Sequence, residues 1–429
     1  MRTSLLRESR FRRFWIGQSV SLIGDQVALF AIPIAAVVVL QANSTEMGVL
    51  TAVGLVPSLL FSLHAGVLID RYGRRRRTMI TADLGRATLM TVVPLCYVLG
   101  LLGLPLLYLV AFALGSFDVA FALADASLFP MLVQRQSYVE AQALLSGSRA
   151  MSAVIGQTLA GLLIAALTAP IALTIDAASF IWSALTLTRI HAPEPQAGEG
   201  GERHQLGAGI HYLRGSPTVR AALAATTTVN YFAFAFTAIF ILYATRSLDV
   251  RPALLGLVLG AGAIGGILGA ALAGPVTDRL GLGRAFALGC VVFPAPLALV
   301  PLATGGRGEI LVFLFLAQFW SGVGVMLLDI SIGAIFAATI PHSLRARVAG
   351  AYRTVNYGIR PLGALTGGIL GNAIGLRPTL WLAVTGATAS AGWLIPSPLL
   401  RKTPRELRPQ TDLSPRTSTP PQRAAEHTN

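Results

Sequence analysis

Long apolar stretches, separated by short polar or Pro/Gly-containing breaks, run through most of the chain. A helix needs about 20 apolar residues to cross the hydrocarbon core of a bilayer. The stretches are continuous rather than alternating, so the pattern favours spanning helices over the strands of a membrane barrel. We predict twelve spanning helices, with very tight turns after the third and the fifth. The predicted segments are 14–40, 48–69, 78–101, 105–129, 149–168, 171–190, 219–244, 253–274, 284–303, 309–332, 354–372 and 379–396.

A polar, Pro- and Gly-rich stretch at 191–218 divides these segments into two groups of six. We therefore expect an N-terminal six-helix bundle over 1–190, a cytoplasmic linker over 191–218 and a C-terminal six-helix bundle over 219–398. Residues 399–429 are rich in Pro, Thr and Arg and have no apolar face, so they are predicted to form a disordered cytoplasmic tail.

Composition excludes most alternatives to an integral membrane protein. Hydrophobic residues make up 54% of the 429 residues and charged residues 12%, whereas a soluble protein carries about twice that share of charge. Cys96 and Cys290 lie inside apolar stretches, which excludes a secreted disulfide scaffold. The net charge of +14 would suit a nucleic-acid partner, but the basic residues sit between apolar segments rather than on one polar face. We therefore expect a lipid bilayer and no nucleic acid as partner.

The distribution of Arg predicts the orientation in the membrane. The connections on one side carry only Arg246, Arg251, Arg307 and Arg377. The other connections and both ends of the chain are rich in Arg. Because positively charged loops stay in the cytoplasm, both termini are expected there. The Arg-rich side holds Arg2, Arg7, Arg10, Arg12, Arg13, Arg71, Arg74 to Arg77, Arg135, Arg203, Arg214, Arg279, Arg345, Arg347 and the tail.

The two halves repeat a motif and several polar positions. The motif after the second segment contains Gly66, Asp70, Arg71, Gly73 and Arg74, and the motif 208 residues later contains Gly274, Asp278, Arg279 and Gly281. Asp118 and Asp329 each lie twelve residues before a Pro, and Asp25 aligns with Asn230. Duplicated six-helix bundles are common in secondary transporters, whose substrate site lies between the halves.

The G-x-x-x-D-R-x-G-x-R pattern at Gly66–Arg75 resembles a loop motif of the major facilitator superfamily, and the resemblance covers residues 10–398. The stretch Phe11–Asp25, followed by Pro33, is most similar to the branch of enterobactin-type siderophore exporters and macrolide-efflux proteins. The resemblance implies two pseudo-symmetric bundles that form a monomer in the inner membrane of a bacterium. It also implies alternating access, in which the repeated motif latches the cytoplasmic side.

Asp70 and Asp278 stand at the C-terminal ends of their predicted helices. A carboxylate there faces the negative end of the helix dipole, which costs several tenths of a kcal/mol. This placement in both halves indicates a partner, such as Arg71, Arg74 or the N-terminus of a neighbouring helix. The alternative is a charge that sets topology beside a tight Gly turn.

Asp25 lies about eleven residues into the first apolar stretch. A carboxylate in the hydrocarbon layer costs at least about 2.5 kcal/mol, so it must face the protein interior. Because such surroundings favour the neutral form of a carboxyl group, Asp25 is the predicted proton-binding residue. The alternative is a structural Asp that hydrogen-bonds to Gln18, Gln26 or a Ser.

Other polar residues within the segments are candidates for the transport pathway. Asp118 is central enough to contribute to proton coupling, and Asp176 is interpreted as structural. Arg86 is either a counter-ion for Asp25 or Asp118, or a local partner of Asp83 three residues earlier. The predicted substrate cavity contains Asn230, Phe234, Asp329 and Arg360.

The leading functional hypothesis is export of an amphipathic drug, macrolide or siderophore-like molecule in exchange for protons. The first alternative is an importer or facilitator of a nutrient, and the second is a sensor or scaffold that acts through the tail. Enzymatic motifs for phosphate binding and metal ligation are missing, so we expect no catalytic residue, metal or cofactor. Related drug–proton antiporters carry an Arg in the fourth segment and a Gly-Pro pair in the fifth. This chain has no Arg between Arg86 and Arg135, and Gln157 follows Gly156.

Overall fold

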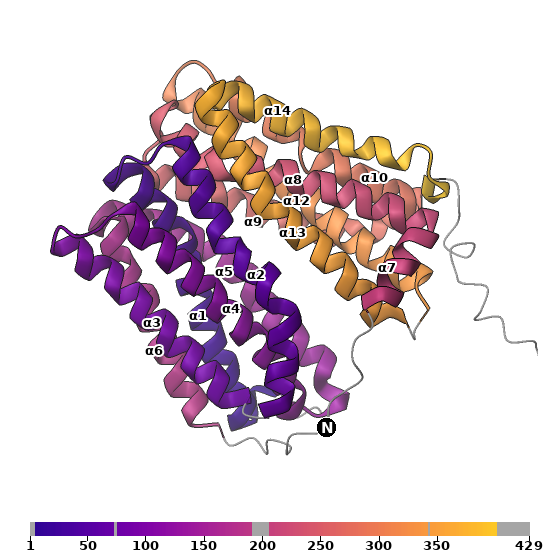
Figure 1. Ribbon diagram of the computed structural model, residues 1–429, viewed down its shortest axis with the longest axis horizontal. Helices are drawn as coiled ribbons and strands as arrows, with labels where there is room; N and C mark the ends of the chain where they lie inside the picture. Colours follow the sequence, from indigo (N-terminus) through magenta and orange to yellow (C-terminus); the bar gives the residue numbers. More distant parts are fainter. Residues whose placement is uncertain (1–4, 73–74, 191–205, 342–343, 401–429) are drawn as a thin grey trace, which may run out of the picture.

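The computed structural model describes residues 5–72, 75–190, 206–341 and 344–400, and the regular structure in these ranges is helical throughout. The first half consists of α1 Ser9–Ile34, α2 Ser44–Tyr72, α3 Arg75–Val98, α4 Leu104–Leu132, α5 Tyr138–Leu167 and α6 Ala169–Thr188. After α7 Leu206–Gly215, the second half consists of α8 Pro217–Arg246, α9 Pro252–Leu280, α10 Leu282–Val292, α11 Leu299–Leu302, α12 Arg307–Thr339, α13 Arg345–Ala373 and α14 Leu376–Ala389. Figure 1 shows the two halves as separate groups of helices.

The predicted all-α fold of twelve segments is confirmed. Within the described ranges, ten helical stretches are long and apolar enough to cross a membrane, and α10 with α11 forms one of them, Leu282–Leu302. The remaining two segments correspond to α13 and α14. Four arginines make α13 less apolar, and α14 has only 14 residues before a 3-10 turn continues it.

The two tight turns are present as predicted. Thr168 alone separates α5 from α6 and has a positive φ of 80°. The break between α3 and α4 contains Gly100, whose φ of 70° favours glycine.

Several helices extend further than their apolar stretches. Helix α5 begins at Tyr138 rather than 149, α13 begins at Arg345 rather than 354, and α12 ends at Thr339 rather than 332. Hydropathy marks the part of a helix that can lie in hydrocarbon, whereas the helix continues as long as its backbone hydrogen bonds do.

Part of the predicted linker is helical. Helix α7 packs against the second half, because Leu213 is buried and the Tyr212 hydroxyl donates to the Thr339 carbonyl at 2.7 Å. Residues 191–205, the first part of the predicted linker, and residues 401–429 of the predicted tail lie outside the described residues. The predicted start of the tail at 399 is wrong, because Leu399 is buried against the second half.

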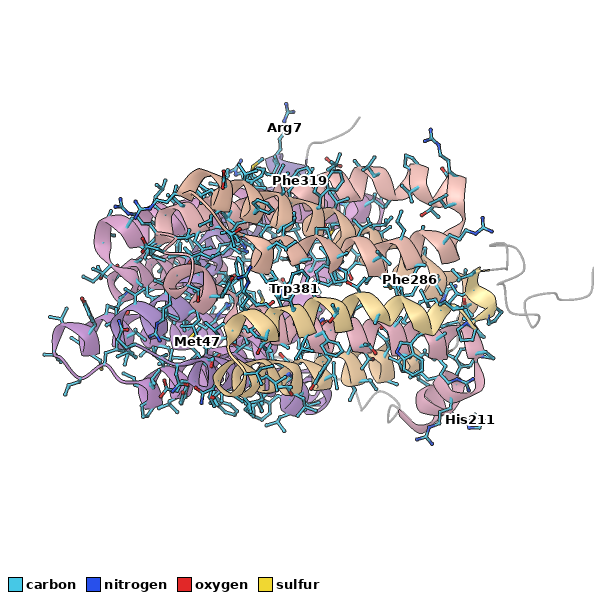
Figure 2. All side chains as sticks on the ribbon, turned by 90° about the horizontal axis from the view of Figure 1, so that it is seen from above. Arg7, Met47, His211, Phe286, Phe319 and Trp381 are labelled. Atoms are coloured by element: carbon cyan, nitrogen blue, oxygen red, sulfur yellow. The ribbon has the colours of Figure 1, made fainter. Side chains whose placement is uncertain are left out.

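The two halves share a hydrophobic core at one end of the molecule and have separate cores at the other. The shared cluster contains Ile34 and Met47 from the first half and Ile239 from the second. The other end has a cluster around Phe14 in the first half and clusters such as that around Phe286 in the second. Figure 1 shows α2 and α13 diverging toward the end where the N-terminus lies. Figure 2 shows Met47 far from His211 of α7. We call these the joined end and the separated end.

Glycine pairs bring the helices of the two halves together at the joined end. A Cβ on Gly48 of α2 would lie 2.8 Å from the Gly368 Cα of α13, and a Cβ on Gly161 of α5 would lie 3.0 Å from the Gly256 Cα of α9. Small residues allow such close backbone packing in membrane proteins. These two crossings hold the halves against each other.

Candidate functional site

Arg86, near the middle of α3, is the centre of polar contacts in the first half. It is 4% exposed, and it forms ion pairs with Asp83 one turn earlier and with Asp118 of α4. The distance from Arg86 Nη1 to Asp118 Oδ1 is 3.0 Å. The local pair and the pair across helices, which the sequence left as alternatives, therefore exist together.

Two aromatic rings enclose the same guanidinium group. The Arg86 Cζ lies 4.4 Å from the ring centroid of Phe121 on α4 and 4.2 Å from that of Phe180 on α6. Cations are attracted to ring faces at such distances. Three helices thus fix the orientation of one charged group.

Asp25 and Asp176 belong to the same cluster. The carboxyl of Asp25 interacts electrostatically with Arg86, Asp118 and Asp83. Asp176 is fully buried on α6, accepts a hydrogen bond from Ser179 Oγ at 3.0 Å and interacts electrostatically with Asp25.

Helix α1 reaches α6 closely at this point, because a Cβ on Gly24 would overlap Asp176 and Ser179. We call Asp25, Asp83, Asp118 and Asp176 with Arg86 the carboxyl cluster. The sequence interpretation treated Asp176 as structural and did not place it beside Asp25. A carboxyl group inside an apolar segment nevertheless indicates a functional residue from the sequence alone.

The structural alternative for Asp25 predicts a hydrogen bond with Gln18, Gln26 or a Ser. The described residues contain no such bond, and the Gln26 Oε1 instead accepts from Gln157 Nε2 at 3.3 Å. Asp118 differs from its partner in exposure, since its side chain is 59% exposed and that of Arg86 is 5% exposed. The Arg86–Asp118 pair therefore joins a buried cation to an exposed carboxylate.

Three of the four predicted cavity residues come together in the second half. Arg360 of α13 donates from Nε to the Asn230 Oδ1 of α8 at 3.0 Å. Its guanidinium lies 5.1 Å from the ring centroid of Phe234 and 4.3 Å from that of Tyr357. Asp329 of α12 interacts electrostatically with Arg360, but the described part of the chain shows no ion pair between them.

The repeated motif lies at the separated end. Asp278 and Arg279 are exposed at the C-terminal end of α9, and no hydrogen bond or ion pair to Asp278 occurs in the described ranges. Gly281 ends this helix with a φ of 81°, which glycine adopts without strain. In the first half, Gly66, Asp70 and Arg71 fall in the last turns of α2, and Gly73 and Arg74 lie outside the described residues.

Comparisons with known proteins place the chain among transporters. A family model described as a transmembrane secretion effector matches residues 2–423. The multidrug efflux pump Tap of Mycolicibacterium fortuitum is 26% identical over 379 residues, which are 83% of this chain and 88% of Tap.

Solved structures share the fold. A bacterial homologue of the iron transporter ferroportin, in an inward-facing state, matches with a TM-score of 0.72 at 16% identity, over 93% of this chain and 100% of that chain. A mutant of the nucleoside transporter NupG matches with a TM-score of 0.71 at 12% identity, over 90% of this chain and 99% of that chain.

Proposed function

The chain belongs to the transmembrane secretion effector family of major facilitator transporters, and from this membership we propose that it exports an amphipathic small molecule in exchange for protons. The substrate class comprises drugs, macrolides and siderophore-like compounds. The similarity to a multidrug efflux pump supports the direction. The predicted placement is the bacterial inner membrane, with both termini in the cytoplasm.

The observation that carries proton exchange is the excess of carboxyl groups in the carboxyl cluster. Four carboxyls share one guanidinium, in the middle of helices that are apolar enough to span a membrane. With all four ionised, three negative charges would lack a cation, and a buried ion such as that of Asp83 or Asp176 costs several kcal/mol. A bound proton removes one of these charges, so the cluster is the proposed site of proton binding.

Asp25 is the proposed proton carrier, with Asp118 and Arg86 as its partners. Asp118 is exposed and shares Arg86 with the buried Asp83. A change of charge at Asp118 therefore alters the electrostatic potential at the other groups of the cluster. A proton that binds at Asp25 weakens its attraction to Arg86 and strengthens the pairing of Arg86 with the other carboxylates.

Alternating access follows from the joined and separated ends. With both termini in the cytoplasm, the separated end faces the cytoplasm, and this structure is the state that receives substrate from inside. To release substrate outside, the joined end must part. That step breaks the Gly48–Gly368 crossing and the hydrogen bond from Arg246 Nη2 to Gln41 Oε1, which is 3.2 Å long.

The repeated motif is proposed to act in the opposite state. Asp278 is exposed and without an ion pair in the described ranges when the separated ends are apart. When these ends approach, Asp70 and Asp278 are the proposed latch residues that hold them together.

The test is proton movement driven by substrate. The protein is placed in everted vesicles with an acid interior, and proton efflux is recorded while macrolides, dyes and siderophores are added. Wild type is expected to release protons with at least one compound, and Asp25→Asn is expected to lose the release. Asp249→Asn is the control, because the Asp249 side chain is 83% exposed and pairs with Arg307, which lies outside the cluster.

The same preparation separates the alternatives. Proton release that persists in Asp25→Asn contradicts Asp25 as the carrier. No release, together with substrate counterflow that needs no gradient, would favour an importer or facilitator. Deletion of 401–429, which leaves the buried Leu399 in place, should leave transport intact, whereas a scaffold acting through the tail would lose its function.

A further inference from the structure

Arg360 is held in a fixed orientation by neutral groups. Its Nε donates to Asn230, whose Nδ2 donates to the Thr226 carbonyl at 2.9 Å and to the Asn356 Oδ1 at 3.1 Å. Asn356 is 4% exposed and donates to the Tyr352 carbonyl at 3.3 Å. These bonds orient the Asn230 amide so that its Oδ1 accepts from Arg360 Nε.

Two aromatic rings also lie against the guanidinium group. The ring centroids of Phe234 and Tyr357 are 5.1 and 4.3 Å from its central carbon. The outer edge of the group carries the donors of Nη1 and Nη2. Neither has a hydrogen-bond acceptor in the part of the chain that the structure describes, and the residue is half-buried rather than enclosed.

Arg86 shows how the protein neutralises an embedded guanidinium group with its own carboxylates. Arg86 likewise lies against two rings, but two carboxylates bind its donors. The hydrogen-bond partner of Arg360 is an amide, and the described ranges contain no carboxylate oxygen within 4.0 Å of it, although Asp329 interacts with it electrostatically from further away. A cation near the middle of a spanning helix is costly without a counter-ion.

We infer that the free edge of Arg360 binds an oxyanion of the transported molecule, a carboxylate on an otherwise apolar and planar body. A guanidinium edge matches the two oxygens of a carboxylate in a bidentate pair. The rings of Phe234 and Tyr357 lie close to the guanidinium and provide apolar surface beside it for the body of such a molecule. This inference rests on the proposed function, because it narrows the substrate class of the same protein.

The test compares two dyes that differ only at the carboxylate. Rhodamine 110 has a free carboxylate, and rhodamine 123 is its methyl ester. Fluorescence anisotropy of the full chain in dodecyl maltoside measures both affinities without a proton gradient, so the result does not depend on proton coupling. Wild type is expected to bind rhodamine 110 about tenfold more tightly than the ester.

Variants assign this preference to Arg360. Arg360→Gln is expected to remove the preference while it still binds rhodamine 123, which also shows that the variant is folded. Arg360→Lys should keep part of the preference, since an ammonium lacks the planar fork. Arg353→Gln, which removes an exposed charge from the same helix, should keep all of it.

Four results would overturn the inference: no binding of rhodamine 110, equal binding of the two dyes, tighter binding of the ester, or a preference that survives in Arg360→Gln. An oxyanion could also come from a lipid headgroup. Phosphatidylglycerol added to the micelles is expected to displace rhodamine 110 no better than phosphatidylcholine does. Stoichiometric displacement by phosphatidylglycerol from wild type, absent in Arg360→Gln, would assign the position to lipid and contradict a substrate site.

Discussion

Two arginines near the middle of the helices are held in the same manner and differ in their counter-ions. Arg86 lies against two rings and pairs with two carboxylates, and Arg360 lies against two rings and pairs with one amide. The Nη1 and Nη2 donors of Arg86 bind carboxylates, whereas those of Arg360 have no acceptor in the described residues. The polar chemistry of the two halves is therefore unequal, although their helices follow one plan.

Sequence was sufficient to single out Asp25, Arg86, Asp118 and Arg360, because a charge inside an apolar stretch is visible without a structure. It was insufficient for Asp176. That contact depends on how closely α1 approaches α6 at Gly24, which is a property of packing between helices. For the same reason, the sequence did not show that Arg86 binds Asp83 and Asp118 together.

Removal of the Arg86 charge should destabilise the first half. Arg86→Met leaves the buried Asp83 and the exposed Asp118 without their cation, and loss of the cation from a buried pair such as Arg86–Asp83 costs about 3–5 kcal/mol. Thermal unfolding in detergent should show a lower Tm, and addition of Asp83→Asn should restore part of the loss. Arg353→Met, at an exposed position, is the control. A Tm for Arg86→Met equal to that of this control would contradict the structural role of the cluster.

At the scale of helices, the number and order of segments follow from hydropathy, but the lengths of some do not. Helix α5 begins eleven residues before its predicted start, and α13 begins nine residues before. These extensions are polar, so they carry no hydropathy signal. They lie at the separated end, where the repeated motif also lies.

The close crossings at the joined end should be sensitive to side-chain size. Gly161→Leu places a bulky group where a Cβ alone would be 2.9 Å from the Pro252 carbonyl oxygen, so we expect α5 and α9 to separate. Spin labels at the exposed Leu101 and Asp249, with Cys96 and Cys290 replaced by Ala, report the distance between the halves.

A longer or broader distance distribution is the expected result. The matched change Gly147→Leu, on the same helix with no atom within 4 Å of its Cβ position, should leave the distribution as in wild type. Equal distributions for Gly161→Leu and wild type would show that this crossing does not hold the joined end.

For the whole molecule, duplication of a six-helix bundle was predictable from the repeated motif, and the family resemblance is confirmed. Which end is joined was not predictable. The same helices build both states of an alternating-access cycle, and the states differ only in which ends of the two halves share a core. The structure shows one state, with the shared cluster at the end away from the N-terminus.

Neutralising the motif should change the balance between the two states. Asp278→Asn removes a proposed latch residue, so the separated state should be favoured and the initial rate of transport should fall several-fold. Spin labels across the separated end and dye uptake into everted vesicles measure the two effects. Glu140→Gln, an exposed change at the same end, is the control. Unchanged rates and distances in Asp278→Asn would leave Asp278 as a charge that only sets topology.

Exchange of a proton for substrate at the carboxyl cluster can be followed as proton release when substrate binds to the purified protein, in weakly buffered detergent with a pH indicator. A transported compound should release protons from wild type and from Asp249→Asn, and Asp25→Asn should bind the compound without release. Binding without release in wild type, or equal release in Asp25→Asn, would contradict this exchange.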